Sequence, residues 1–203
     1  MTDATWVERL EPDAPDLVSA WRGIEVGRFV TVRREVRRRA GPGSADRVVA
    51  QLATTAAAFL QVLDRASPAL LALPGGEGDW NVAQAIGHVA ESRAGLCLAA
   101  SKAATGHWPT DAPRVVPGIA GAAEADIETL RRKITQSQRI VERAARSVVG
   151  HESDPCPLEH PEVGRLRCGE WLLFAGVHDL MHLDQLHGLR ERDRSVTSVA
   201  AER

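Results

Sequence analysis

The chain has 203 residues, of which 44% are apolar and 26% charged, and its formal net charge is −2. These values are typical of one globular domain with a sizeable core, and the balanced charge argues against a nucleic-acid-binding or anionic-membrane-binding protein. No apolar run approaches the roughly 18 residues of a membrane-spanning helix, and the acidic N-terminus does not resemble a signal peptide, so we expect a cytoplasmic protein that contacts neither nucleic acid nor membrane.

Four segments have the apolar period of amphipathic helices, and no segment has the alternation that predicts a strand. Ahead of them, residues 1–43 form an N-terminal extension that we expect to be partly helical. The four predicted helices cover about 44–66, 79–102, 122–149 and 168–190. Two loops rich in Pro and Gly, 106–121 and 150–167, separate the last three helices. This pattern predicts an all-α fold, an antiparallel four-helix bundle over 44–190 followed by a C-terminal tail, 191–203.

The ends of these helices carry residues that suit helix termini. Ser44 and Asp79 are predicted N-caps of the first two bundle helices, and Gly150 is placed to end the third. The basic run 33–39 in the extension is typical of a solvated helix end, where cations suit the helix dipole. No aromatic residues are interleaved with it, so it does not favour a nucleic-acid contact.

The last predicted helix carries two histidines on its buried face. With about 100° between successive residues, His178, His182 and Gln185 lie within about 60° of one another, on the face that also carries Trp171 and Phe174. An i, i+4 pair of imidazoles can bind one metal ion. Alternatively, the two rings could be core histidines that bond to each other, to Gln185 or to water.

A third histidine favours the metal. His88 lies on the second predicted helix, beside apolar positions and next to a small, polar flank. It can meet the last helix across the core. Three histidines from two helices leave coordination positions open, as catalytic and ligand-binding metal sites do.

Two stretches resemble the DinB-like (YfiT-like) superfamily of metal-binding four-helix bundles. The first is WNVAQAIGHVAE, with a Trp near the helix start and a His eight residues later. The second is HPEVGRLRCGEWLLFAGVHDLMHLDQL, in which an HPxxGxL loop leads into an EWL helix start and HxxxHxxQ. The chain departs from the family pattern at Arg167, where many relatives have a Ser or Thr cap, and in residues 1–43, which have no counterpart.

The resemblance implies a site for one divalent metal ion, with zinc and nickel as the leading candidates, on His88, His178 and His182. Gln185 is expected to hydrogen-bond a ligand imidazole or metal-bound water. Some members of the superfamily transfer low-molecular-weight thiols to electrophiles, and others use mycothiol to isomerise maleylpyruvate. The dominance of arginine over lysine, typical of GC-rich genomes such as those of actinobacteria, is compatible with mycothiol.

Three functions therefore stay open. The chain could be a metal-dependent thiol S-transferase acting on small electrophiles, a metal-dependent hydrolase, or a non-catalytic protein that binds or senses a small molecule. No general base is evident, and a homodimer through helix faces is plausible. His187 is predicted to lie at the surface, His160 to have a structural role in its loop, and Cys168 to be a small buried residue rather than an activated thiol.

Overall fold

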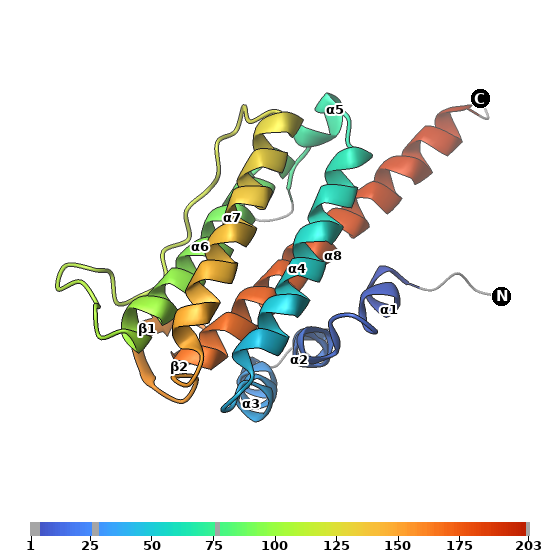
Figure 1. Cartoon of the computed structure of the whole chain (residues 1–203). Helices are drawn as coiled ribbons and strands as arrows, with labels where there is room; N and C mark the ends of the chain where they lie inside the picture. The colour runs from blue at the N-terminus through green and yellow to red at the C-terminus, as the bar shows by residue number, and fades with distance from the viewer. Residues whose placement is uncertain (1–4, 26–28, 76–77, 202–203) are drawn as a thin grey trace.

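The computed structural model describes residues 5–25, 29–75 and 78–201, which form a mostly helical protein (Figure 1). Among these residues, no helix has both the length and the apolar character needed to cross a bilayer. The helices and strands are α1 (Trp6–Leu10), α2 (Pro15–Glu25), α3 (Phe29–Arg39), α4 (Ala45–Asp64), α5 (Pro68–Leu71), α6 (Val82–Ala104), α7 (Ile127–Val148), β1 (Pro155–His160), β2 (Gly164–Arg167) and α8 (Cys168–Ala201).

The predicted all-α four-helix bundle is confirmed, and it consists of α4, α6, α7 and α8. The helix directions need one correction, because α6 and α7 run parallel. Glu91 pairs with Lys133, and further along both helices Arg93 donates to Gln138. Figure 1 likewise shows α4 and α8 rising together while α6 and α7 descend. The residues between α6 and α7 can span the bundle because an extended chain covers about 3.3 Å per residue, against 1.5 Å in a helix.

The absence of strands was predicted wrongly. Between α7 and α8 the chain forms an antiparallel hairpin, with Glu159 opposite Arg165 and His160 opposite Gly164. The turn uses the HPxxG segment, and Gly164 adopts a φ of 69°, which favours glycine. The hairpin also holds the long loop 105–126, because Val116 N donates to Glu159 O and Glu159 N to Arg114 O.

Helix ends differ from the predicted ones. Ser44 makes no side-chain cap bond. Asn81 rather than Asp79 caps α6, in a capping box with Gln84. At α8, which lacks the family's Ser or Thr cap, Glu170 accepts from Arg167 N, while Cys168 N donates to Asp154 O and Gly169 N donates to Glu152 O. The helix does not end near residue 190 but continues to Ala201, since residues 191–201 contain neither Gly nor Pro.

The N-terminal extension packs against the bundle and shares its core. Leu17 of α2 is fully buried and fits against Gly176 of α8, where a Cβ would meet the leucine at 2.5 Å. Asp16 anchors the extension electrostatically: its carboxylate pairs with Arg39 and Arg47 and accepts a hydrogen bond from Gln51. The extension thus closes the face of the bundle formed by α4 and α8.

A buried ion pair joins three of the bundle helices. Arg93 of α6 and Asp179 of α8 are both fully buried, with an N···O distance of 3.2 Å. Thr55 of α4 donates to Asp179, and Arg93 donates to the carbonyl of Leu52, also on α4. Asp179 directly follows His178, and Arg93 lies five residues after His88. The ion pair therefore fixes how α6 and α8 face each other near these two histidines.

Replacing Asp179 by Asn should lower the free energy of unfolding by about 3–5 kcal/mol, because the buried Arg93 charge loses its partner. Asp64→Asn is the matched control, since its pair with Arg131 lies at the surface and should contribute less than about 1 kcal/mol. Urea denaturation of both variants measures the difference. Equal losses would contradict the structural role of the buried pair.

Acid should weaken the attachment of the extension through Asp16. Burial alone would raise the pKa of Asp16, but hydrogen bonds from Gln51 and Arg47 and the nearby guanidinium charges hold it below its usual value. Its stabilising contribution is therefore present above the unfolded pKa of about 3.9 and is lost as pH falls through the folded value. Asp16→Asn should flatten this acid part of the stability curve, measured by denaturation at a series of pH values.

Candidate metal centre

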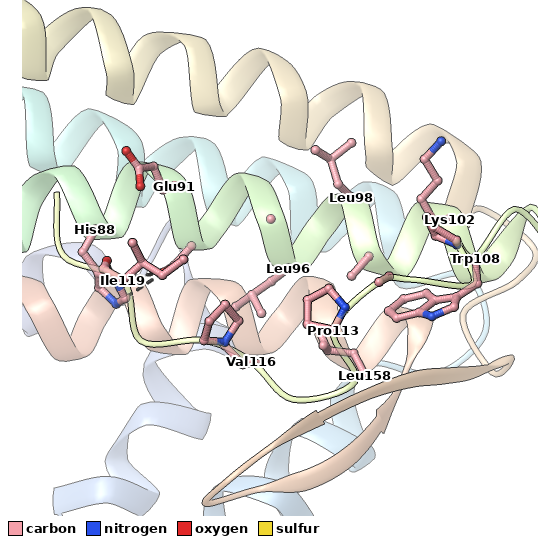
Figure 2. Close-up of a pocket in the computed structure, with 16 residues that line it drawn as sticks. His88, Glu91, Leu96, Leu98, Lys102, Trp108, Pro113, Val116, Ile119 and Leu158 are labelled. Carbon is pink, nitrogen blue, oxygen red and sulfur yellow. Dashed lines mark hydrogen bonds between the residues drawn. The ribbon is translucent and has the colours of Figure 1, made fainter.

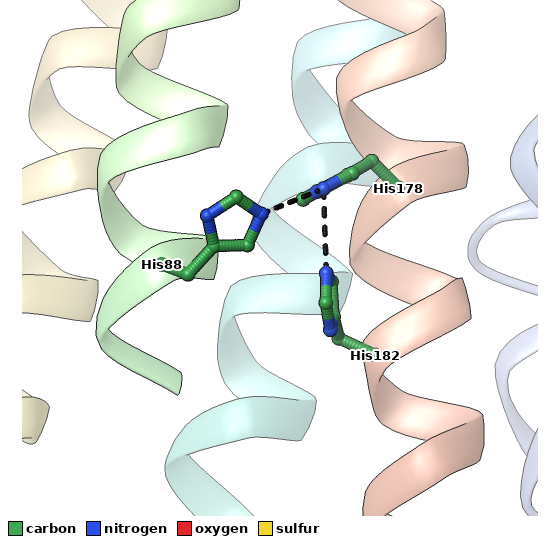
Figure 3. A group of neighbouring side chains, drawn as sticks. All are labelled: His88, His178 and His182. Atoms are coloured by element: carbon green, nitrogen blue, oxygen red, sulfur yellow. Dashed lines mark hydrogen bonds between the residues drawn. The ribbon is translucent and has the colours of Figure 1, made fainter. Parts of the chain in front are cut away.

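Three imidazoles from two antiparallel helices converge in the middle of the bundle (Figure 3). His88 projects from α6, and His178 and His182 project from successive turns of α8. The Nε2 atom of His178 lies 3.2 Å from that of His88 and 3.3 Å from that of His182. All three candidate ligand atoms lie within 4.8 Å of one another. The structure thus brings together the three histidines that the sequence singled out.

These spacings fit a bound ion. Nitrogens at about 2.0–2.1 Å from a tetrahedral zinc ion are about 3.3 Å apart, which matches two of the three Nε2–Nε2 distances. Hydrogen bonds on the far side of two rings support this arrangement. His88 Nδ1 donates to Ile119 O at 2.7 Å, and His182 Nδ1 donates to Gln185 Oε1 at 2.8 Å. Neutral rings held in this way direct the Nε2 lone pairs inward, where one cation can be shared by all three.

Electrostatics keep two of these rings neutral. Burial holds the pKa of His178 well below its usual value, and the neighbouring His182 and His88 lower it further. Burial, with a contribution from His88, lowers the pKa of His182 to about 4 despite the opposing hydrogen bond to Gln185. A neutral imidazole is the form that coordinates a metal. At neutral pH His178 and His182 therefore need not lose protons before an ion binds.

The long loop 105–126 sets the orientation of His88. Gly121 lies directly on Gly87 of α6, and its N–H donates to Gln84 O at 3.1 Å. A Cβ on Gly121 would meet Gly87 Cα at 2.7 Å, so only glycine allows this approach. Two residues earlier, the carbonyl of Ile119 accepts the hydrogen bond from His88 Nδ1. Sequence reasoning missed this backbone partner, because a carbonyl in an irregular loop carries no side-chain signal.

A cavity of about 330 Å³ opens onto the imidazoles, large enough for a small molecule. Phe29 from the extension and Trp80 before α6 form part of its wall. His160 also lines it, packing edge-on against Phe174 and accepting a hydrogen bond from Glu162 N. Because Nδ1 is the acceptor, the neutral ring carries its proton on Nε2. His160, assigned only a structural role from the sequence, thus stands at the cavity wall.

The other residues considered from the sequence lie away from the imidazoles. His187 stacks on Trp6 of α1 at a centroid distance of 5.1 Å. Cys97, Cys156 and Cys168 are free and buried. Burial raises the pKa of Cys97 and of Cys168 to about 12, so neither thiol is a ready nucleophile.

Comparison with known proteins gives one decisive match. The sequence model of the DinB superfamily matches residues 51–186. The chain belongs to the DinB superfamily. The match covers about two thirds of the chain and contains all three imidazoles, whereas the N-terminal extension lies outside it. No curated protein and no solved structure matches the chain. The comparison therefore assigns the chain to a superfamily and to no narrower group.

Enlarging Gly121 should weaken metal binding without touching a ligand. In Gly121→Ala the added Cβ pushes the loop from α6 and withdraws the Ile119 carbonyl from His88. Loss of such a supporting hydrogen bond typically lowers metal affinity about 10- to 100-fold. Competition with a chromogenic chelator measures the affinity for added zinc. Gly118→Ala in the same loop is the control, because its Cβ meets no atom within 4 Å; equal affinities for the two variants would contradict the role of the loop.

Proposed function

We propose that the chain binds one divalent metal ion through His88, His178 and His182 and uses it to transfer a low-molecular-weight thiol to small electrophiles. The supporting observation is the convergence of three Nε2 atoms at the wall of a cavity. Zinc and nickel both suit imidazole ligands. A divalent ion at this position supplies Lewis acidity, which lowers the pKa of a coordinated thiol or water.

The ligand set supports a role beyond structure. Structural zinc sites usually have four protein ligands, whereas catalytic sites keep a position open. Among the described residues, the cluster of metal-ligating side chains contains only the three histidines. Gln185, which faces the same cavity, has its amide oxygen engaged by His182. An ion held by these histidines would have a coordination position left for a small ligand, and the cavity beside the imidazoles would give such a ligand access.

The cavity wall favours thiol transfer over hydrolysis. Hydrolysis by activated water usually requires a general base close to the reacting water. Of the residues described as lining the cavity, Glu162 is the only carboxylate, and it is exposed to solvent. Glu91, the nearest carboxylate along α6, is paired with Lys133. A thiol that is already ionised needs no such base to attack an electrophilic carbon.

The chain's own side chains would position the reactants. Trp80, whose ring lies 4.9 Å from that of His88, and Phe29 offer apolar surfaces, and the Nε2–H of His160 offers a hydrogen bond to a polar group of a ligand. Burial lowers the pKa of His160, so the ring is neutral at pH 7 and remains a donor through one nitrogen. The thiol and the reactive end of its acceptor would meet where these groups lie beside the three imidazoles.

Incubation of the zinc- or nickel-loaded protein with mycothiol and monochlorobimane tests this proposal. A fluorescent thioether should form as the sulfur–carbon bond is made and chloride leaves. Chelation should abolish the reaction, and so should the double variant His178→Ala/His182→Ala. A rate equal to that without protein, across mycothiol, bacillithiol, cysteine and glutathione, would contradict transferase activity and favour a binding or sensing role.

His160→Phe separates cavity function from metal binding. The variant should retain one ion per chain, measured by elemental analysis, because His160 is not in the ligand cluster. Its rate of thioether formation should fall about 10- to 100-fold if the hydrogen bond orients a reactant. An unchanged rate would restrict His160 to packing against Phe174.

A further inference from the structure

A second cavity, of about 370 Å³, lies between α6 and the long loop 105–126 (Figure 2). Volumes of this size are typical of small-molecule sites. Its lining is mostly apolar and includes Leu96, Leu98, Trp108, Val116, Ile119 and Leu158. We call this cavity the α6 groove. Nothing in the thiol chemistry proposed above uses it.

The α6 groove begins at the imidazoles. Five residues line both this groove and the imidazole cavity: His88, Ser92, Leu96, Val116 and Pro117. Figure 2 shows His88 and Ile119 at one end and Trp108 with Lys102 at the other. Lys102 lies fourteen positions after His88 on the same helix, so the groove follows α6 for about 21 Å. Its shape suits an elongated molecule with one end at the metal centre.

A glycine keeps part of the groove open. Gly95 lines it in the middle of α6, where glycine is the least favourable residue apart from proline. A Cβ added at Gly95 would meet no atom within 4 Å, so the packing of the chain itself does not require glycine. A larger side chain at this lining position would occupy open space beside the groove.

The rim of the α6 groove holds apolar side chains in contact with solvent. Of the large apolar residues described as exposed, Leu98 and Ile119 line the groove and are 42% and 56% exposed. Val115, next to the lining residue Val116, is 54% exposed. Polar groups are few along its length: Glu91 is paired with Lys133, and Ser92 lies against His88. Lys102 and the indole N–H of Trp108 lie at the end of the groove away from the imidazoles. Between the two ends of the groove a sugar or nucleotide would find little hydrogen bonding, whereas an apolar chain would bury these surfaces favourably.

We propose that the α6 groove binds the elongated apolar body of the electrophilic substrate, of the alkyl-chain type, with its reactive end beside His88. The assignment of the occupant as the electrophile rests on the proposed function. Two cavities that share a wall at the imidazoles suit a reaction of two substrates: the polar thiol enters the imidazole cavity, and the apolar acceptor lies along α6. Binding of the apolar chain requires no metal, because the groove is built from side chains and loop backbone.

Titration calorimetry of the metal-free protein with butanol and octanol tests the groove directly. Each buried methylene should strengthen binding about four-fold, so octanol should bind more than about a hundred-fold tighter than butanol. Gly95→Leu should weaken octanol binding at least ten-fold by filling the groove. Gly188→Leu is the matched control, since Gly188 is also a glycine within a helix whose Cβ would meet no atom within 4 Å.

Equal affinity for the two alcohols, or unchanged octanol binding in Gly95→Leu, would overturn the proposal. A third result would also overturn it: analytical ultracentrifugation shows a dimer whose interface covers the groove, and this dimer binds neither alcohol. Failure of the thiol-transfer assay is a separate result, because the calorimetric readout involves neither metal nor thiol. If octanol binds as expected and transfer occurs, S-alkylation of mycothiol by bromooctane should be lost in Gly95→Leu, while reaction with the compact monochlorobimane persists.

Discussion

The Nε2 atoms of three imidazoles lie close together inside the bundle. Hydrogen bonds from the rings and the packing of α6 against α8 hold them there. Two of the rings donate outward, His88 to a loop carbonyl and His182 to Gln185. These bonds leave the Nε2 atoms of His88 and His182 as lone-pair donors, each at a distance from His178 Nε2 that matches two ligands of a tetrahedral ion. Burial opposes protonation of His178 and His182, so a cation shared by the inner nitrogens would stabilise the cluster.

The positions of the three imidazoles depend on the directions of the bundle helices. Because α6 and α7 run parallel, the chain must return along the bundle between them, and it does so through loop 105–126. That loop supplies the carbonyl for His88, is attached to α6 at Gly121, and is fixed to the hairpin at Glu159. It also forms one side of the α6 groove. Loop 105–126 thereby orients His88 and also forms a wall of the α6 groove beside it.

Sequence patterns predicted the parts of the structure that depend on local periodicity. The four bundle helices follow from apolar spacing, and the two histidines of α8 follow from their shared face. His88 was found because its helix faces the same core. The parallel pair, the hairpin and the Ile119 carbonyl depend on long-range backbone contacts in segments rich in Pro and Gly, where neither helical nor strand periodicity exists. The Arg93–Asp179 pair was missed because charged residues are normally expected at the surface.

The central claim is that the three histidines hold one ion, and X-ray absorption spectroscopy on the zinc-loaded protein tests it most directly. The account predicts one zinc per chain, with imidazole nitrogens at about 2.0–2.1 Å contributing three ligands and a lighter atom completing the shell. The variant with His88, His178 and His182 replaced by Ala should take up no zinc under the same conditions. A spectrum dominated by sulfur ligands, or full zinc content in that variant, would contradict the account.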